Sequence, residues 1–480
     1  MSGDHECDLV IRGARVFDGS GGTPAVADVA VAGGRIIAVG EALALSARDS
    51  VEAEGRALAP GFIDVHTHDD MAVFDRSTIL PKLSQGVTTV VTGNCGISLG
   101  PTPLTRRDIP VPPLDLIATA GEYRFASFGA FLEGMRAAGP AVNVVPLVGH
   151  TVLRARAMED LDGPATPDEI ALMRRDLGEA LEQGAAGLST GLAYPPAKAS
   201  TTGEILSLVR DVAGAGKLWT THMRDERTGV VSAVAETIDI ARRSGARTLI
   251  SHHKCCGQAA FGLSRTTLAM IEEARAEIPL DIDVYPYTAS STVLIEAYVR
   301  DSRKVTISWS DPHPEMAGRD LAGVAGEWGV DIIEAVARLK PGGGIYHQMD
   351  DGDLERIMAW PPSLIGSDGL PRDRRPHPRL WGSFPRVLGH YARDKGLLSQ
   401  AEAVAKMTGQ TAKVLGLADR GRIAEGCAAD LVLFDPESIR SVADYDNPQE
   451  RSAGIAAVYV NGQLAYAPDV SEGALAGQVL

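Results

Sequence analysis

Two histidines, two residues apart, end an apolar run near the start of the chain. His66 and His68 close the run 61–68. Alternate residues of a β-strand project to the same face, so both imidazoles would point one way while Thr67 points the other. Imidazole is the commonest metal ligand in proteins. An HxH pair is weak evidence by itself, but it predicts a metal site if other ligand-type residues reach the same place.

Four more residues of ligand or acid type follow later apolar runs, namely Cys95, His222, His252 and Asp368. A thiolate and two imidazoles make a good zinc set, with the fourth position left for water. A carboxylate near that position can take a proton from water and pass it to a leaving nitrogen. Amide cleavage needs this proton transfer because an amine anion is a very poor leaving group. The residue types therefore predict metal-assisted hydrolysis, with Asp368 as acid and base.

Each of these residues also has an ordinary structural explanation. A histidine can be a satisfied core residue, Cys95 a buried free thiol, and Asp368 a helix cap or turn residue. Five separate segments ending in such residues favour the metal interpretation. His253 should point away from His252 and is interpreted as structural or as a contact behind the ligands. Cys255 and Cys256 have no ligand spacing, although they could line the pocket.

The elements that must position these residues alternate along the middle of the chain. Eight apolar, β-branched runs are separated by amphipathic stretches such as 167–183 and 230–244; the runs are 61–68, 88–93, 142–150, 186–191, 218–223, 248–253, 280–287 and 363–369. Eight such units predict an α/β fold, a (β/α)8 TIM-like barrel, whose active site lies at the carboxyl ends of its strands. An open doubly wound sheet is the alternative.

Both ends of the chain show short strand patterns with glycine turns. The runs 9–12, 28–31 and 35–39 lie at one end, and 430–434 and 454–460 at the other. Neither end can bury a core alone, so we expect one small β domain formed from both termini. The expected division is 1–59 and 416–480 for this domain and 60–415 for the barrel. Two unrelated terminal hairpins are the alternative.

Two connections of the expected barrel are unusually long, which is typical of functional loops. The stretch from Gly93 to Phe125 is rich in proline. The stretch 288–349 precedes the last barrel strand and contains a predicted strand at 304–309 and several helices. We expect this insertion to act as a lid over the barrel mouth.

The amino-acid composition limits the classes of function that this protein can have. The formal net charge of −16 argues against nucleic acid and anionic membranes as partners, which leaves a small-molecule substrate. Five cysteines in 480 residues do not suggest a disulfide framework, and the N-terminus shows no signal-peptide pattern. No run is long enough to span a membrane. We therefore expect a cytoplasmic protein that is a monomer or small homo-oligomer.

Several motifs resemble a known family. The segment 60–68 (PGFIDVHTH) resembles the metal-binding opening of the amidohydrolase superfamily, and 426–432 (GCAADLV) resembles its closing strand. More specific stretches resemble the D-aminoacylases, the N-acyl-D-amino-acid deacylases; they are TVVTGNCG (89–96), STGLAYP (189–195), THMRDE (221–226), SHHK (251–254), GSDGLP (366–371) and PHPRLWG (376–382). The resemblance covers essentially the whole chain.

The resemblance implies roles for residues that match the family's motifs. It implies one tight zinc held by Cys95, His222 and His252, a second and weaker metal position at His66 and His68, and Asp368 as catalytic acid and base. Cys95 would stand where other amidohydrolases bridge two metals with a carboxylated lysine or a glutamate. The residues implied for binding the substrate's α-carboxylate are Lys254, Tyr285 and Arg379, with Tyr194 and Ser291 as weaker candidates.

The expected reaction is zinc-dependent hydrolysis of N-acyl-D-amino acids to a D-amino acid and a carboxylic acid. Cyclic-amide hydrolysis, as in hydantoinases and dihydroorotases, is the alternative enzyme, and a scaffold without activity is the alternative class. The stretch 290–299 contains no Lys or Arg, and its one charge, Glu296, would repel an acid. Its apolar residues and Tyr298 predict a preference for hydrophobic D-side chains, although Arg300 follows directly.

Overall fold

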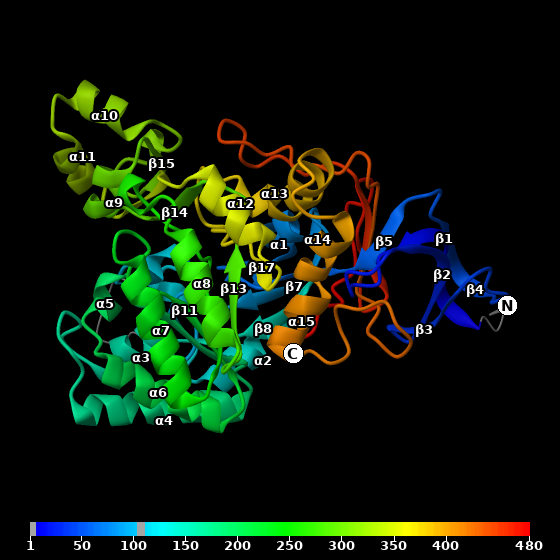
Figure 1. Ribbon diagram of the computed structural model, residues 1–480, viewed down its shortest axis with the longest axis horizontal. Coiled ribbons are helices and arrows are strands. Elements are labelled where there is room, and N and C mark those ends of the chain that lie inside the picture. The colour runs from blue at the N-terminus through cyan, green and yellow to red at the C-terminus, as the bar shows by residue number, and fades with distance from the viewer. Residues whose placement is uncertain (1–5, 103–110) are drawn as a thin grey trace.

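The computed structural model describes residues 6–102 and 111–480, and its centre consists of parallel strands (Figure 1). Each of the eight expected runs contains a strand of one of two parallel sheets, and the third run contains two. The three-stranded sheet contains β6 (Phe62–Asp64), β7 (Val87–Thr92) and β8 (Asn143–Pro146). The six-stranded sheet contains β9 (Val148–Gly149), β10 (Gly187–Gly191), β11 (Leu218–His222), β12 (Arg247–Ile250), β13 (Leu280–Val284) and β17 (Ser363–Ile365).

The two parallel sheets meet at both of their edges. Only Leu147 separates β8 from β9. At the other edge, Thr67 and Gly369 form a single parallel bridge beyond the ends of β6 and β17, and Asp368 N donates to His66 O at 2.8 Å. Within the described residues the strands do not form one unbroken ring. The order of the strands is nevertheless the expected one, so their carboxyl ends face a common region.

Helices follow the parallel strands, and the two amphipathic stretches named from the sequence are α4 (Pro167–Gln183) and α7 (Val230–Ser244). Thr166 and Glu169 form a capping box at the start of α4, and Gly184 ends it in the left-handed conformation. The other helices around the parallel strands are α1 (Arg76–Leu83), α2 (Phe128–Ala138), α3 (His150–Ala157), α5 (Pro195–Lys198), α6 (Thr202–Gly214), α8 (Ser264–Arg275), α12 (Asp351–Ala359), α13 (Arg379–Arg386), α14 (Gln400–Met407) and α15 (Gly409–Leu415). In the described part of the chain, no helix has the length and apolar character needed to cross a bilayer.

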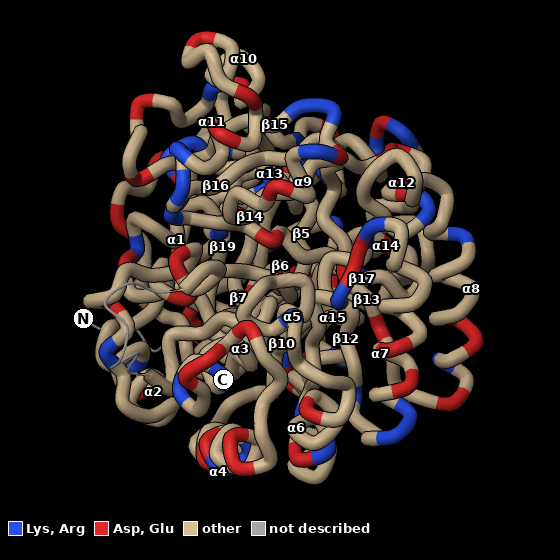
Figure 2. The backbone as a smooth tube through the Cα atoms, turned by 90° about the vertical axis from the view of Figure 1, so that its left-hand side faces the viewer, with Lys and Arg blue, Asp and Glu red and all other residues tan. Residues whose placement is uncertain are grey.

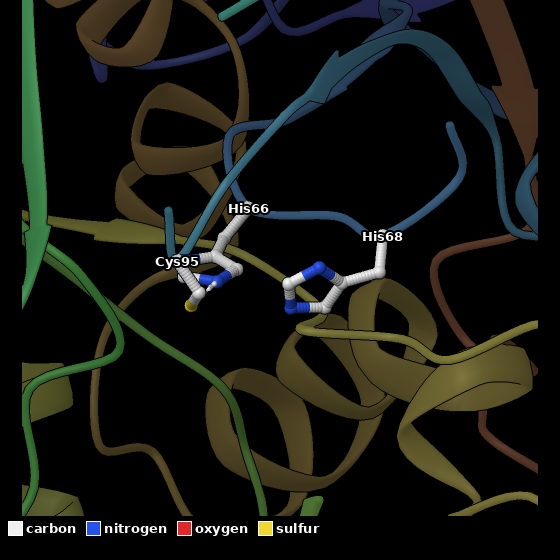
Figure 3. A group of neighbouring side chains, drawn as sticks. All are labelled: His66, His68 and Cys95. Atoms are coloured by element: carbon white, nitrogen blue, oxygen red, sulfur yellow. Dashed lines mark hydrogen bonds between the residues drawn. The ribbon is translucent and has the colours of Figure 1, made fainter. Parts of the chain in front are cut away.

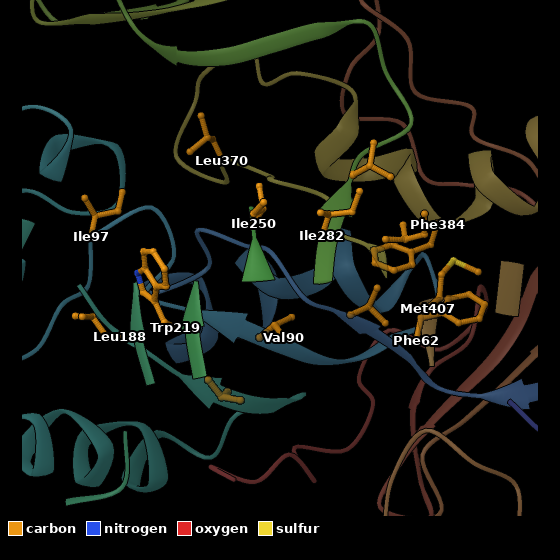
Figure 4. Packing of buried hydrophobic residues seen from close by; sticks show 14 of the residues in the cluster. Phe62, Val90, Ile97, Leu188, Trp219, Ile250, Ile282, Leu370, Phe384 and Met407 are labelled. Atoms are coloured by element: carbon orange, nitrogen blue, oxygen red, sulfur yellow. The ribbon is translucent and has the colours of Figure 1, made fainter. Parts of the chain in front are cut away.

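The main core lies between the parallel strands and the helices that cover them (Figure 4). Trp219 of β11 is fully buried and donates its indole N–H to Thr190 Oγ1 at 3.2 Å. Burying a large aliphatic or aromatic side chain contributes about 1.5–3 kcal/mol. Charged residues lie mainly on the outer helices, as Figure 2 shows for α4, α7 and α8.

Strands from both ends of the chain share one eight-stranded sheet. It runs β20-β19-β18-β5-β1-β2-β3, with β4 paired to β1. Its strands are β1 (Cys7–Val16), β2 (Ala25–Ala32), β3 (Arg35–Gly40), β4 (Ala47–Glu52), β5 (Ala57–Pro60), β18 (Leu431–Phe434), β19 (Ile455–Val460) and β20 (Gln463–Tyr466). The antiparallel pairing of β18 with β5 joins the two ends, and the sheet has an apolar cluster of its own. The expected terminal strands all fall within it.

The insertion before β17 has a sheet and a core of its own. Three antiparallel strands, in the order β14-β16-β15, are β14 (Ala289–Val293), β15 (Val305–Ser310) and β16 (Gly342–His347). Its helices are α9 (Glu296–Asp301), α10 (Leu321–Trp328) and α11 (Ile332–Leu339). The sequence predicted only the strand at β15, because β14 is rich in serine and threonine and β16 begins with three glycines. In Figure 1 α10 and α11 project from the body of the protein.

Candidate metal centre and active site

The five expected metal ligands and Asp368 meet at the carboxyl ends of the parallel strands. His222 is the last residue of β11, and the others lie just beyond β6, β7, β12 and β17. Their ligand atoms form three overlapping groups, each with all atoms within 4.8 Å of one another: His66–His68–Cys95, Cys95–His222–His252 and His66–His252–Asp368. All six residues are buried. The convergence expected from the sequence is therefore present.

Cys95 belongs to two of these groups. Its Sγ lies 3.3 Å from His66 Nε2 and 3.4 Å from His252 Nε2. In Figure 3 the side chains of Cys95, His66 and His68 point toward a common space. This position, between the HxH pair and the other two histidines, is where a ligand shared by two metal ions would lie.

The loop that carries Cys95 is packed closely against its neighbours. A Cβ on Gly93 would lie 2.1 Å from Leu147 O, and one on Gly96 would lie 2.8 Å from Gly191 N. Both glycines also have positive φ angles. Only glycine fits these two positions, and the close approach brings Cys95 over the ends of the strands.

Three of the site residues have a strained backbone. Cys95, His252 and Asp368 have φ angles of 53°, 37° and 52°. A residue with a side chain is held in this region at a cost of about 1–3 kcal/mol, which the surrounding structure must offset. Such strain is concentrated where a side chain must be aimed in one direction.

Burial keeps His66 and His252 neutral, and each ring contacts a carboxylate through Nδ1. Burial lowers the pKa of each imidazole to about 3. His66 Nδ1 lies 3.4 Å from Asp283 Oδ2, and His252 Nδ1 lies 3.0 Å from Glu226 Oε1. We assign the proton of His66 to Nδ1 from its contact with Asp283. That leaves His66 Nε2 unprotonated and directed at Cys95, as a metal ligand requires. His252 Nδ1 also lies 2.7 Å from Lys254 Nζ, and an ammonium cannot donate to a protonated nitrogen, so the two contacts of His252 do not fix its tautomer.

The surroundings of the His222 ring indicate whether the proposed ligands suit a bound metal ion. Neither of its buried ring nitrogens forms a hydrogen bond within the described residues, and the carboxylate nearest to it, Glu226, has Oε2 at 3.4 Å from Nε2. An unpaired buried polar group is costly, and a bound cation would remove that cost. A donor set of one sulfur and two nitrogens suits zinc in particular. The residues present therefore fit the metal that the sequence predicted.

Burial raises the pKa of the Cys95 thiol well above its usual value, and the charge of Asp368 adds to the effect. A bound cation reverses this because it deprotonates a coordinating thiol. Metal binding must therefore release the proton of Cys95, and the affinity for metal must fall as the pH falls.

Asp368 lies between the HxH pair and an arginine. Its Oδ1 lies 3.2 Å from His68 Nε2, and its Oδ2 lies 2.8 Å from Arg379 Nη1. Burial would raise the pKa of Asp368, but Arg379, His252 and His68 outweigh it and hold the pKa well below its usual range. The carboxylate is therefore ionised and able to accept a proton.

The residues implied for substrate binding take two positions. Lys254, Tyr194 and Ser291 line the cavity beside the metal ligands. Lys254 Nζ donates to Glu226 Oε1 at 2.7 Å, and Tyr194 OH lies 3.1 Å from Thr292 Oγ1.

Tyr285 and Arg379 lie behind Asp368. The Arg379 guanidinium lies 4.6 Å from the centre of the Tyr285 ring, and its Nη2 donates to Ser291 O at 3.1 Å. Arg379 Nε is buried without a hydrogen-bond partner in the described residues. In this structure the arginine therefore holds Asp368 and still has a donor free.

Sequence reasoning missed three charged residues of the site. Glu226 contacts both His252 and Lys254, and Asp283 contacts His66 and accepts from His252 N at 2.9 Å. Arg227 lines the cavity and forms an ion pair with Asp301. The signal for Asp283 was a carboxylate inside the apolar run 280–287, and Glu226 stands four residues after His222. His253 is a structural residue, as expected, with Nε2 2.8 Å from Thr267 Oγ1.

The sequence model of the amidohydrolase family matches residues 49–466. The chain belongs to the amidohydrolase family. D-aminoacylase of Alcaligenes xylosoxydans xylosoxydans is 48% identical to this amidohydrolase, and the match covers 98% of this chain and 97% of that protein. The N-acyl-D-aspartate and N-acyl-D-glutamate deacylases of the same organism are each 46% identical, covering 99% and 95% of this chain and 95% and 93% of theirs.

Solved structures give the same relationship. A crystal structure of D-aminoacylase superposes with a TM-score of 0.96 at 48% identity, covering 99% of both chains. The N-acyl-D-glutamate deacylase of Bordetella bronchiseptica, complexed with zinc and a phosphonate inhibitor, gives 0.93 at 43% identity, again over 99% of both. An L-hydantoinase of Arthrobacter aurescens, at 16% identity and a TM-score of 0.59 over 98% of this chain and 99% of its own, shares the fold alone. This amidohydrolase is thus a metal-dependent hydrolase of the D-aminoacylase group.

Proposed function

We propose that this amidohydrolase hydrolyses N-acyl-D-amino acids with zinc held by Cys95, His222 and His252. A second, weaker metal position is proposed at His66 and His68. The observation that carries the proposal is the buried sulfur–nitrogen ligand set beside an ionised Asp368. It is supported by relatives named for D-amino-acid deacylation, one of which binds zinc and a mimic of the tetrahedral intermediate.

In the proposed reaction the metal and the protein side chains have separate roles. When bound, zinc supplies Lewis acidity toward the scissile carbonyl and the attacking water. Asp368 takes the proton of that water and later donates it to the leaving nitrogen. Arg379 keeps Asp368 in place, since its Nη1 lies 2.8 Å from Asp368 Oδ2.

We assign the substrate's α-carboxylate to Arg379, Tyr285 and Lys254. A planar guanidinium binds a carboxylate with two donors, and Arg379 Nε has no partner within the described residues, although Arg379 lies behind Asp368 and not in the lining of the cavity. Tyr194 and Ser291, which line the cavity, are proposed to contact the acyl group or the carboxylate. Hydantoins lack this carboxylate, so the clamp argues against a hydantoinase reaction.

The deciding experiment is a screen of the zinc-loaded enzyme on N-acetyl-D-amino acids, their L-enantiomers and hydantoins. We expect release of free amino acid from the D-series alone. Turnover of hydantoins without turnover of N-acetyl-D-amino acids would overturn the proposed function.

The same assay tests the side-chain preference. We propose that N-acetyl derivatives of D-Leu, D-Met, D-Phe or D-Trp have a higher kcat/KM than those of D-Glu and D-Asp. The tyrosines Tyr194 and Tyr298 line the cavity, and an unpaired carboxylate buried against them would be costly. The ratio of kcat/KM for D-Leu to that for D-Glu, at equal zinc loading, should exceed one. A ratio below one would contradict the preference.

The structure changes part of the basis for this preference. Leu294 packs in the core of the insertion and Val293 in the main core, so neither lines the cavity as expected. Arg227, which the sequence reasoning missed, does line it. Its guanidinium lies 5.2 Å from the centre of the Tyr298 ring and is paired with Asp301. Asp301 is half exposed, and neither Nη atom of Arg227 has a hydrogen-bond partner within the described residues, so a preference for acidic side chains would point to Arg227.

We also propose that the insertion 288–349 is a lid. Its residues Ser290, Thr292, Tyr298 and Gln348 line the cavity, which places it at the carboxyl ends of the strands. The cavity has a volume of about 20 Å³, enough for about one water molecule. The insertion is a wall of this cavity with its own core, and its movement would open the cavity to a substrate. The division into 1–59, 60–415 and 416–480 is proposed with it.

A further inference from the structure

One buried lysine contacts two segments that carry site residues. Lys82 of α1 is fully buried. Its Nζ donates to Asp64 Oδ2 at 2.8 Å and to Ser367 Oγ at 2.5 Å, and lies 3.4 Å from Asp69 Oδ2. Asp64 precedes the HxH pair, Asp69 follows it, and Ser367 precedes the catalytic aspartate. None of these four is among the described residues that line the cavity.

The contacts continue from Lys82 into the backbone of the site. Asp64 Oδ1 accepts from Ser367 N at 2.8 Å and from His66 N at 3.3 Å. Ser367 Oγ also accepts from Gly369 N at 3.1 Å. The Lys82 ammonium therefore contacts the loop of His66 through the Asp64 side chain, and the loop of Asp368 through the Ser367 side chain.

The loop of Asp368 needs such support. Asp368 has a φ of 52°, a conformation that persists only where the surroundings impose it. Its carboxylate must also stay within reach of His68 and of the reacting atoms. A Cβ on the next residue, Gly369, would lie 3.1 Å from Lys82 Nζ, so the lysine fills the space directly behind this loop.

We propose that Lys82 is a positioning residue for the hydrolysis, which holds His66 and Asp368 in their working geometry through Asp64 and Ser367. This rests on the proposed function, since it takes Asp368 as the catalytic acid and base. Lys82 touches neither substrate nor metal ligand and acts only through its partners. Cys95, His222 and His252 lie outside its contacts, so the tight zinc does not depend on it.

The test is Lys82→Met, which keeps length and apolar bulk but removes the charge and the donors. We expect kcat to fall about 100-fold with KM changed little, because displacement of a catalytic group by about 1 Å can cost that much. The second equivalent of zinc, assigned to His66 and His68, should bind about tenfold more weakly in a calorimetric titration. The first equivalent should bind as in the wild type.

Lys406 provides a matched control. It is also buried, and its Nζ donates to Trp360 O, Pro361 O and Ser363 O at 2.7, 2.9 and 3.1 Å, at the end of β17 remote from the site. Lys406→Met should lower Tm without lowering kcat or the affinity for the second zinc. An equal loss of kcat in both variants would overturn the proposal, because general destabilisation would then explain it.

Ser367→Ala keeps the test decisive if Lys82→Met does not fold. It removes the contact between Lys82 and the Asp368 loop together with the hydrogen bond from Gly369 N to Ser367 Oγ, and kcat should fall about tenfold. Folded, zinc-loaded Ser367→Ala with wild-type kcat and wild-type affinity for the second zinc would overturn the proposal. Failure of the proposed function would look different, because the wild-type enzyme itself would then leave N-acetyl-D-amino acids intact.

Discussion

Asp368→Asn should lower kcat by about 10³-fold while the protein stays folded and keeps its tight zinc. The asparagine side chain has nearly the same shape and can still accept a hydrogen bond from Arg379, but it cannot take a proton from water. General acid and base catalysis contributes about 10²–10⁴-fold, and here one carboxylate serves in both steps. Because Arg379 loses its ion partner at 2.8 Å, Tm should also fall.

The measurement is kcat on N-acetyl-D-leucine together with zinc content and Tm. Asp176→Asn is the control, since Asp176 is equally buried, at 7%, and lies in α4 with Arg156 and Arg175 as its partners. It should lower Tm and leave kcat near that of the wild type. Wild-type kcat in Asp368→Asn would remove Asp368 from the mechanism.

The parallel strands could be predicted because their sequence signals are local. Runs such as 218–223 and 280–287 are apolar, and each contains a strand. The capping box of Thr166 and Glu169 sets the start of α4 in the same way. The strands β14 and β16 lack such signals, since serine, threonine and glycine occupy positions that apolar residues would mark. Their pairing with β15 decides their structure.

The convergence of the proposed metal ligands could be predicted because the fold places every strand end at one rim. Cys95, His222 and His252 needed only a strand assignment and their residue type. Their partners could not be found in this way. Asp283 meets His66 across 217 residues of chain, and Ser367 meets Lys82 across 285. Contacts of this kind depend on the three-dimensional arrangement of the strands. A local sequence pattern contains no information about that arrangement.

The side-chain pocket shows the limit of reasoning from one stretch of sequence. Residues 290–299 were expected to line it, but Leu294 and Val299 face the core of the insertion. Arg227 enters the pocket from the loop after β11, far away in the chain. A pocket bounded by several loops takes its charge from all of them, so counting cations in one loop does not decide the preference.

Cys95→Ala should abolish both zinc binding and activity. Cys95 supplies the one thiolate of the proposed tight site, and its Sγ is within 3.4 Å of ring nitrogens from two histidines. Removing a hydrogen-bond partner that only orients a metal ligand lowers the metal affinity by about 10–100-fold. Removing the ligand itself must lower the affinity more. Alanine also leaves His222 and His252 as a two-ligand site, which is too few to hold zinc firmly.

Zinc per chain after dialysis and kcat on N-acetyl-D-leucine are the measurements for Cys95→Ala. Cobalt substitution adds an independent readout, because a thiolate ligand gives a charge-transfer absorption that alanine cannot. Cys255→Ala is the matched control, since Cys255 is a buried thiol of the neighbouring loop that packs in the main core. It should keep the zinc, the absorption and the activity. If Cys95→Ala retained one zinc per chain and near-normal kcat, the metal would be held by His66, His68 and Asp368 instead, and the two proposed metal positions would have to exchange their roles.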